Sequence, residues 1–333
     1  DIVPTGTTYT WTNPVIQPAG GISGATSQAI PQTLISQLLV NNTKAVATAT
    51  YTVTPESNGC VGENFRIVVT VDPPVSTNTI VNDISCFGVN DGSITASIEG
   101  GIPPYTILWT GPGGFTSALT SISGLAPGDY NLKVTDNVGV DFSSVYTIKE
   151  PLELVLVTDL NKNVSCFGAA NGEISVSVSG GTPPYKYVWT KNNMAFDTIK
   201  NITNLSPGVY NVSITDSHDC GPKTASYAIT EPKAIVISVT NQVNLKCFGD
   251  SIGSVSIQVD GGVPIEKMPG IFDYNYSWTG PNGFNSNAKD LFNLSAGIYT
   301  LEVSDSTGCS KKFSVTITQP EEIKIKVTQT PIS

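Results

Sequence analysis

Residues 180–189 read Gly-Gly-Thr-Pro-Pro-Tyr-Lys-Tyr-Val-Trp, and residues 205–210 read Leu-Ser-Pro-Gly-Val-Tyr. The glycine and proline pairs separate runs in which apolar and polar side chains alternate, the period of half-buried strands. Such runs occupy residues 152–157, 173–178, 185–189, 199–205, 209–215 and 225–230. About seven strands with turn signals every 8–12 residues predict an antiparallel β-sandwich of immunoglobulin type, with almost no helix.

The same passage is written three times along the chain. Cys-Phe-Gly begins at residues 86, 166 and 247, at spacings of 80 and 81 residues. A tryptophan and a tyrosine follow in step each time: Trp109, Trp189 and Trp278, then Tyr130, Tyr210 and Tyr299. Tandem units of this size predict an array of similar domains, an architecture more typical of reach, display or adhesion than of catalysis.

The repeats divide the chain into five parts. We expect a leading module over residues 1–72, truncated at its N-terminus, repeats over 73–151, 152–232 and 233–320, and the first strand of a further truncated repeat over 321–333. Each repeat ends in Glu-Pro or Gln-Pro and leads directly into the next strand, which leaves little hinge freedom. An all-β chain of tandem immunoglobulin-like sandwiches joined in this way is predicted to form an extended head-to-tail rod.

The repeated aromatic residues are better explained as core than as a ligand platform. Trp189 falls on the third strand, where such sandwiches bury a large indole. The pattern Leu-x-Pro-Gly-x-Tyr at residues 205–210 is typical of a tyrosine corner, in which the phenol bonds to the backbone upstream. Exposed aromatic residues could instead stack on sugars, but their fixed place in every repeat favours core packing.

Composition excludes some classes of function. The formal net charge is −10 with 17 lysines and arginines, and no basic face is available to neutralise phosphates. No stretch approaches the roughly 20 apolar residues that cross a bilayer as a helix. We therefore expect neither nucleic acid binding nor membrane insertion by this chain.

The repeat resembles the SprB repeat of giant surface adhesins of gliding Bacteroidetes. The shared pattern is Cys-x-Gly-x-x-x-Gly-x-Ile, Gly-Gly-x-Pro-Pro-Tyr-x-x-x-Trp and Leu-x-Pro-Gly-x-Tyr-x-x-x-x-x-Asp, and it covers residues 83–151, 163–232 and 244–320. The leading module resembles PKD-like domains. The resemblance implies a cell-surface adhesin, secreted by the type IX pathway and carried along the surface during gliding. The third repeat departs from the pattern through extra residues at 266–273.

Six cysteines in an apparently exported chain favour disulfides. Bonds within repeats would pair Cys166 with Cys220 and Cys247 with Cys309, but they leave Cys86 alone, because Val140 stands where a partner would be.

Sandwich topology favours bonds between neighbouring repeats instead. The Cys-Phe-Gly turn and the last turn of one repeat lie at opposite poles, about 25 Å apart, whereas a disulfide needs Cα atoms within about 7 Å. We therefore expect Cys86–Cys220 and Cys166–Cys309, with Cys60 and Cys247 unpaired. The path of the long first strand leaves both schemes open.

Other candidate sites are weaker. Asn/Asp-Gly sequences at 90–92, 171–172 and 250–253 could suggest calcium, but they carry too few carboxylates and favour turns. We expect no metal, cofactor or zinc site; His218 is the only histidine and falls in a predicted turn. Thr198 and Ser251 follow aspartate and precede isoleucine, a pattern that Bacteroidetes use for O-glycosylation.

The function predicted is that of a non-enzymatic stalk in a large extracellular adhesin for surface attachment and gliding motility. No nucleophile elbow, phosphate loop or His/Ser/Asp set is present, so we do not expect an enzyme. Its partners would be an extracellular surface or glycan, with the gliding and secretion machinery reached through other parts of the parent chain. The alternatives are a carbohydrate-binding accessory region of a polysaccharide-active protein and, less favoured, a eukaryotic adhesion ectodomain.

Overall fold

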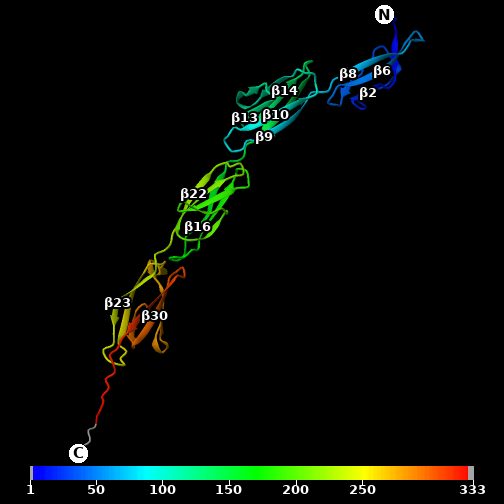
Figure 1. Cartoon of the computed structure of the whole chain (residues 1–333). Helices are drawn as coiled ribbons and strands as arrows, with labels where there is room; N and C mark the ends of the chain where they lie inside the picture. Colours follow the sequence, from blue (N-terminus) through cyan, green and yellow to red (C-terminus); the bar gives the residue numbers. More distant parts are fainter. Residues whose placement is uncertain (1–2, 329–333) are drawn as a thin grey trace, which may run out of the picture. The chain divides into compact units, whose positions relative to one another are not determined.

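The computed structural model describes residues 3–328, which form short strands joined by turns (Figure 1). These residues contain no α-helix and two single 3-10 turns, η1 (Pro112–Gly114) and η2 (Pro281–Gly283). Within them, no helix is long and apolar enough to span a membrane. The chain separates into two compact units, residues 1–153 and 154–333, and each is described by itself. The prediction of an all-β chain is confirmed.

The first unit begins with a module centred on the long strand β6 (Ala47–Ser57). Alternate β6 side chains are buried, and together with Trp11 and Ile22 they form the core of the module. Strand β6 pairs with β1, β2, β7 and β8, while β3 and β5 form a separate ladder. The other strands are β1 (Thr8–Trp11), β2 (Val15–Gln17), β3 (Ile22–Ser23), β4 (Gln28–Gln32), β5 (Val40–Asn41), β7 (Cys60–Val61) and β8 (Phe65–Val71).

The first repeat completes this unit as a two-sheet sandwich. Strands β13-β10-β9 form one sheet and strands β12-β11-β14-β15 the other. Their bounds are β9 (Ser76–Asn82), β10 (Gly92–Glu99), β11 (Thr106–Thr110), β12 (Thr116–Ser117), β13 (Ser121–Leu125), β14 (Gly128–Thr135) and β15 (Asp141–Ile148). Every pairing in both sheets is antiparallel, as the alternating pattern predicts.

The second unit holds two further sandwiches of the same topology. In the second repeat the sheets are β16-β17-β20 and β19-β18-β21-β22. Its strands are β16 (Val155–Lys162), β17 (Gly172–Ser179), β18 (Lys186–Lys191), β19 (Met194–Asp197), β20 (Ile202–Leu205), β21 (Gly208–Thr215) and β22 (Lys223–Ile229).

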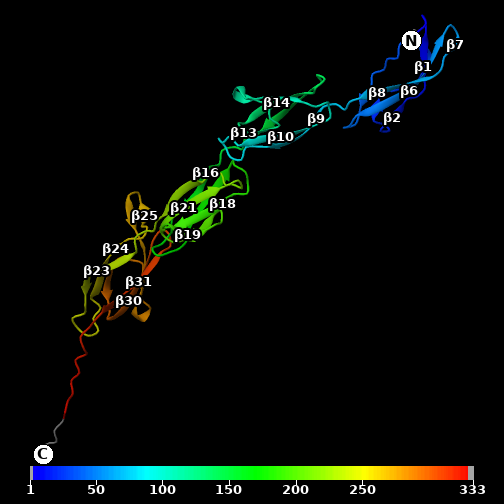
Figure 2. The ribbon, with the colours of Figure 1, turned by 45° about the horizontal axis from the view of Figure 1, so that its top comes forward.

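In the third repeat the sheets are β23-β24-β29 and β28-β27-β30-β31. The strands are β23 (Val236–Val243), β24 (Gly253–Asp260), β25 (Ile265–Met268), β26 (Ile271–Asp273), β27 (Asn275–Thr279), β28 (Asn285–Ser286), β29 (Leu291–Leu294), β30 (Gly297–Ser304) and β31 (Ser310–Ile317). The extra residues of this repeat form the additional hairpin β25–β26, labelled at β25 in Figure 2.

The cores are separate. Among the described residues, four apolar clusters lie within residues 9–71, 75–148, 156–229 and 235–317. Each cluster draws on residues of one expected module, and none merges two modules into a common interior.

Four details differ from the sequence-based expectation. The run predicted at residues 199–205 forms a strand only over Ile202–Leu205. The first strand of the second repeat begins at Val155, not at residue 152, and runs to Lys162. Strand β19, at residues 194–197, was not among the predicted runs. Residues 321–328, expected to begin a further repeat, form no strand, because no neighbouring strand in the described chain pairs with them; residues 329–333 lie outside the described residues.

Candidate functional site at the junction of the second and third repeats

A buried aspartate shapes the turn that precedes the last strand of the third repeat. Asp305 is 4% exposed. Its Oδ1 accepts the backbone N–H groups of Thr307 and Cys309, both at 3.0 Å, and its Oδ2 accepts the N–H of Val263 at 2.9 Å. One carboxylate therefore joins the β30–β31 turn to the turn after β24 and fixes the backbone of Cys309.

The other repeats use the same arrangement. Asp216 accepts from Thr182, His218 and Cys220 at 2.8–2.9 Å, and Asp136 accepts from Ile102, Val138 and Val140 at 2.8–3.1 Å. Burial alone would raise the pKa of each of these carboxyls. The hydrogen bonds from the backbone, joined at Asp305 by one from the Thr307 hydroxyl, outweigh burial, so the pKa of all three lies below the usual value.

The second glycine of each Gly-Gly pair is required beside this carboxylate. Gly262 has φ +58°, in the left-handed region that favours glycine. A Cβ at Gly262 would lie 2.7 Å from Asp305 Oδ2 and 2.8 Å from Ile235 Cγ1. The Gly-Gly sequence and the distant aspartate therefore form one structural device.

The turn carries a disulfide to the preceding repeat. Cys309 is bonded to Cys166, with Cα atoms 5.6 Å apart and a sequence separation of 143. Thr307 Oγ1 lies 3.2 Å from the carbonyl oxygen of Ser165, which adds a polar contact across the junction. Bonding within the third repeat is therefore wrong, because Cys309 is engaged elsewhere and Cys247 is a free, exposed thiol.

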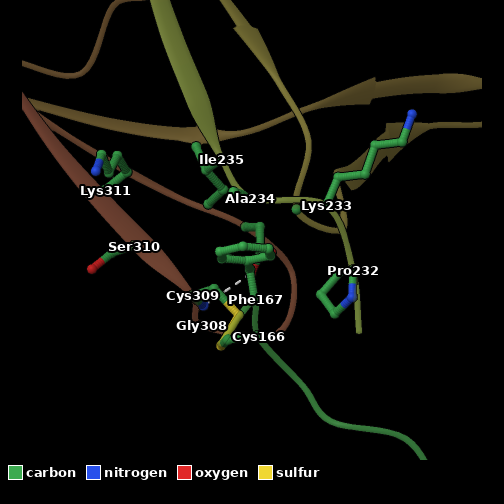
Figure 3. Close-up of a pocket in the computed structure, with 12 residues that line it drawn as sticks. Cys166, Phe167, Pro232, Lys233, Ala234, Ile235, Gly308, Cys309, Ser310 and Lys311 are labelled. Atoms are coloured by element: carbon green, nitrogen blue, oxygen red, sulfur yellow. Dashed lines mark hydrogen bonds between the residues drawn. A yellow bond between two sulfur atoms is a disulfide. The ribbon is translucent and has the colours of Figure 1, made fainter. Parts of the chain in front are cut away.

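An apolar side chain accompanies the disulfide. Phe167 lines a cavity of about 490 Å³ together with Pro232, Ala234 and Ile235 from the start of the third repeat. Figure 3 shows the Phe167 ring beside the Cys166–Cys309 bond. Phe167 remains 60% exposed, so the ring is only partly enclosed and the covalent bond is the stronger link.

The Cys-Phe-Gly turn is itself held by the end of its own repeat. The backbone N–H of Gly168 donates to Glu231 Oε2 at 2.7 Å. The same contact joins Gly88 to Glu150 at 2.7 Å and Gly249 to Gln319 at 3.0 Å. The glutamate or glutamine before each junction proline therefore anchors the turn that presents the cysteine.

The remaining cysteines divide into two groups. Cys60, at the start of β7, and Cys247, in the turn after β23, are free and exposed thiols. The predicted bond between Cys86 and Cys220 would join residues of two separately described units, and it stays a prediction.

The repeated aromatic residues lie in the cores. The tryptophans are at most 1% exposed and the tyrosines at most 2%. Each indole Nε1 donates to a carbonyl ten residues later, at 2.9–3.1 Å: Leu119, Ile199 and Ala288. Each tyrosine hydroxyl donates to the carbonyl four residues earlier, at 2.8–3.1 Å: Ala126, Ser206 and Ser295. No face of these rings is available to stack on a sugar.

Sequence reasoning missed a phenylalanine that packs on each tyrosine corner. Phe115, Phe196 and Phe284 contact the corner tyrosines edge to face, with ring centroids 5.2–5.4 Å apart. In the first and third repeats the signal was present as Gly-Pro-Gly-Gly-Phe and Gly-Pro-Asn-Gly-Phe, residues 111–115 and 280–284. In the second repeat strand β19 supplies the ring from a different spacing, which hid the equivalence.

The other candidate residues occupy exposed turns. Thr198 and Ser251 are exposed, and Asp197 Oδ1 accepts the N–H groups of Thr198 and Ile199. His218 is exposed in the β21–β22 turn. The Asn171 side chain exchanges two hydrogen bonds with Ser165, which accounts for it as a turn residue. Within residues 3–328, no group of three or more His, Cys, Asp and Glu is placed to hold a metal ion.

Two known family models match residue ranges within these modules. The model described as "SprB repeat" matches residues 78–114 and 161–194, in the first and second repeats, and the model described as "PKD-like domain" matches residues 1–75. The chain therefore carries SprB repeats behind a PKD-like domain, and this architecture fits a stalk region of a cell-surface adhesin.

The chain also shows weaker similarity to one curated protein and to solved structures of immunoglobulin-like domains. A decoration protein of Escherichia phage T5 is 32% identical over 84 residues, which cover 23% of this chain and 51% of that protein, so the match spans about half its length. Three N-terminal domains of the Hoc protein of bacteriophage RB49 superimpose with a TM-score of 0.39, at 17% identity over 73% of this chain and 95% of theirs. Sidekick-1 immunoglobulin domains 1–5 give 0.36, at 13% identity over 96% and 75%. Structural similarity at this level is no evidence of a shared function.

Proposed function

We propose that this chain, with its SprB repeats and PKD-like domain, is a non-enzymatic stalk segment of an extracellular adhesin. The parent protein attaches cells to surfaces and takes part in gliding motility, after export by type IX secretion in a member of the Bacteroidetes. Its partners are an extracellular surface or glycan, and the gliding and secretion machinery is reached through other parts of the parent chain.

The disulfide between the second and third repeats is the observation that carries this proposal. A covalent link between neighbouring sandwiches adds nothing to a catalytic pocket, but it resists separation of modules under load. The repeated aromatic residues are buried, which argues against a sugar-stacking strip and so against the carbohydrate-binding alternative.

A replacement experiment in the producing bacterium tests the proposal. A stalk depends on length and stiffness more than on surface chemistry, so exchange of residues 152–320 for unrelated immunoglobulin-like domains of equal number should preserve attachment to glass and agar. Deletion of the same residues should reduce attachment. If the exchanged protein fails to attach while the isolated chain binds one defined sugar on a glycan array, the segment is a binding module instead.

A further inference from the structure

The disulfide at the junction changes which residues carry tension. Cys166 follows β16, the first strand of the second repeat, and Cys309 immediately precedes β31, the last strand of the third. Their separation of 143 places 142 residues between them, and these include every strand from β17 to β30. A pull on the two ends of the chain has a covalent path that never enters this segment.

We propose that the Cys166–Cys309 bond is a force bypass. Tension passes along β16, through the disulfide and along β31, while strands β17–β30 remain in a closed, unloaded loop. The proposal rests on the stalk function and goes beyond it, because it makes the second and third repeats a length that cannot be extended while the bond lasts.

The two strands that carry the load, β16 and β31, can extend only slightly under tension. A β-strand rises about 3.3 Å per residue, and a fully stretched chain spans at most about 3.6 Å per residue. Each strand is pulled from both of its own ends, so the load runs along its backbone. The hydrogen bonds that pair β16 with β17 and β31 with β30 are therefore not needed to hold the load.

The disulfide keeps a long segment of chain, the 142 residues between Cys166 and Cys309, out of the loaded path. Fully extended, 142 residues span about 50 nm, whereas the folded loop closes with its cysteine Cα atoms 5.6 Å apart. Without the bond, both sandwiches lie on the loaded path and each can unfold and lengthen the chain. One disulfide thus decides whether about 50 nm of chain is available to a pulling force.

The local structure fits both cysteines for this role. Asp305 fixes the backbone of Cys309, and Glu231 anchors the turn that presents Cys166. The bond therefore joins two turns that are each secured within their own repeat, and neither lies on a free loop.

Single-molecule stretching of the full chain, held at both ends, tests the bypass. Serine at positions 60, 86, 220 and 247 leaves only the Cys166–Cys309 bond, and non-reducing mass spectrometry verifies that it is present. We expect oxidised molecules to show unfolding of the leading module and the first repeat only. Reduction of the same molecules should add unfolding steps that raise the contour length by about 50 nm.

The matched variant Cys166→Ser/Cys309→Ser, in the same background, should give the additional length without any reductant. Circular dichroism compares its strand content with that of the oxidised chain. Oxidised molecules that release the full 50 nm, or reduced molecules that release none of it, would overturn the bypass. Either result leaves the attachment experiment to decide the stalk function separately.

Discussion

The last turns of the first and third repeats are built from the same bonds, yet only one carries a disulfide. Asp136 accepts the N–H of Val140 at 2.8 Å, and Asp305 accepts the N–H of Cys309 at 3.0 Å. In both turns the backbone of this position enters the network, while the side chain is an exposed valine in the first repeat and a disulfide-bonded cysteine in the third. The aspartate therefore fixes the backbone of the turn whether valine or cysteine occupies this position.

The largest expected effect comes from removing the carboxylate itself. Asp305→Ala and Asp136→Ala each remove a buried carboxylate and leave three backbone N–H groups at partly buried positions without their acceptor, and unsatisfied groups of this kind are costly. Three lost hydrogen bonds to a charged group are worth about 4 kcal/mol or more, so we expect the melting temperature of the affected repeat to fall by about 20 °C or more. Thermal unfolding followed by circular dichroism measures the loss in each variant.

This pair of variants tests the comparison directly. If the turn is independent of the cysteine, the two substitutions should lower stability to a similar extent. Asp129→Ala, at an exposed position on β14, provides a control that should change little. A large loss in the first repeat and none in the third would show that the disulfide, and not the aspartate, organises the turn of the third repeat.

A smaller loss is expected from the glycine beside the carboxylate. Gly262→Ala combines an unfavourable left-handed conformation with close contacts to Asp305 and Ile235, together worth about 3 kcal/mol. Gly308→Ala is the matched control, because Gly308 has φ +82° but open space around its Cβ position, so only about 1 kcal/mol should be lost. Urea unfolding measures both; equal losses would mean that the carboxylate tolerates a methyl group beside it.

Acid should weaken both turns, by less than removal of the carboxylate. The pKa of Asp136 and of Asp305 is lower in the folded chain than the value of about 3.9 in an unfolded chain. Their stabilisation is therefore complete above about pH 4 and is lost as pH falls through the folded-state pKa. Urea unfolding between pH 6 and pH 2 should show this decline. Asp305→Asn should flatten it for the third repeat, and an unchanged slope would contradict the assignment.

Much of the fold could be predicted because it depends on local patterns. Strand alternation, the Gly-Gly-x-Pro-Pro break and the tyrosine corner each act over a few residues, so the sequence shows them directly. The topological argument, that Cys166 and Cys220 lie at opposite poles of one sandwich, was also enough to propose the Cys166–Cys309 pair that the structure contains.

What could not be predicted depends on contacts between distant residues. The aspartate ends the repeated sequence pattern, but the pattern does not reveal its role, since its three donors come from two turns about 45 residues apart. The contact between Gly168 and Glu231 spans 63 residues. The hairpin β25–β26 follows from an insertion whose pairing no periodic pattern marks.

The smallest expected effect is the most specific test of the comparison. Val140→Cys places a cysteine on the turn of the first repeat, where the side chain is 49% exposed and the backbone N–H and carbonyl make the hydrogen bonds, both to Asp136. The free energy of unfolding should change by no more than about 0.5 kcal/mol, and the new thiol should react with a maleimide as readily as an exposed cysteine. Val138→Cys, two residues earlier and 61% exposed, is the control for labelling. If Val140→Cys unfolds the repeat, the turn built by the aspartate does not by itself accept a cysteine at this position. The turn of the third repeat would then need further differences around Asp305 to accommodate Cys309.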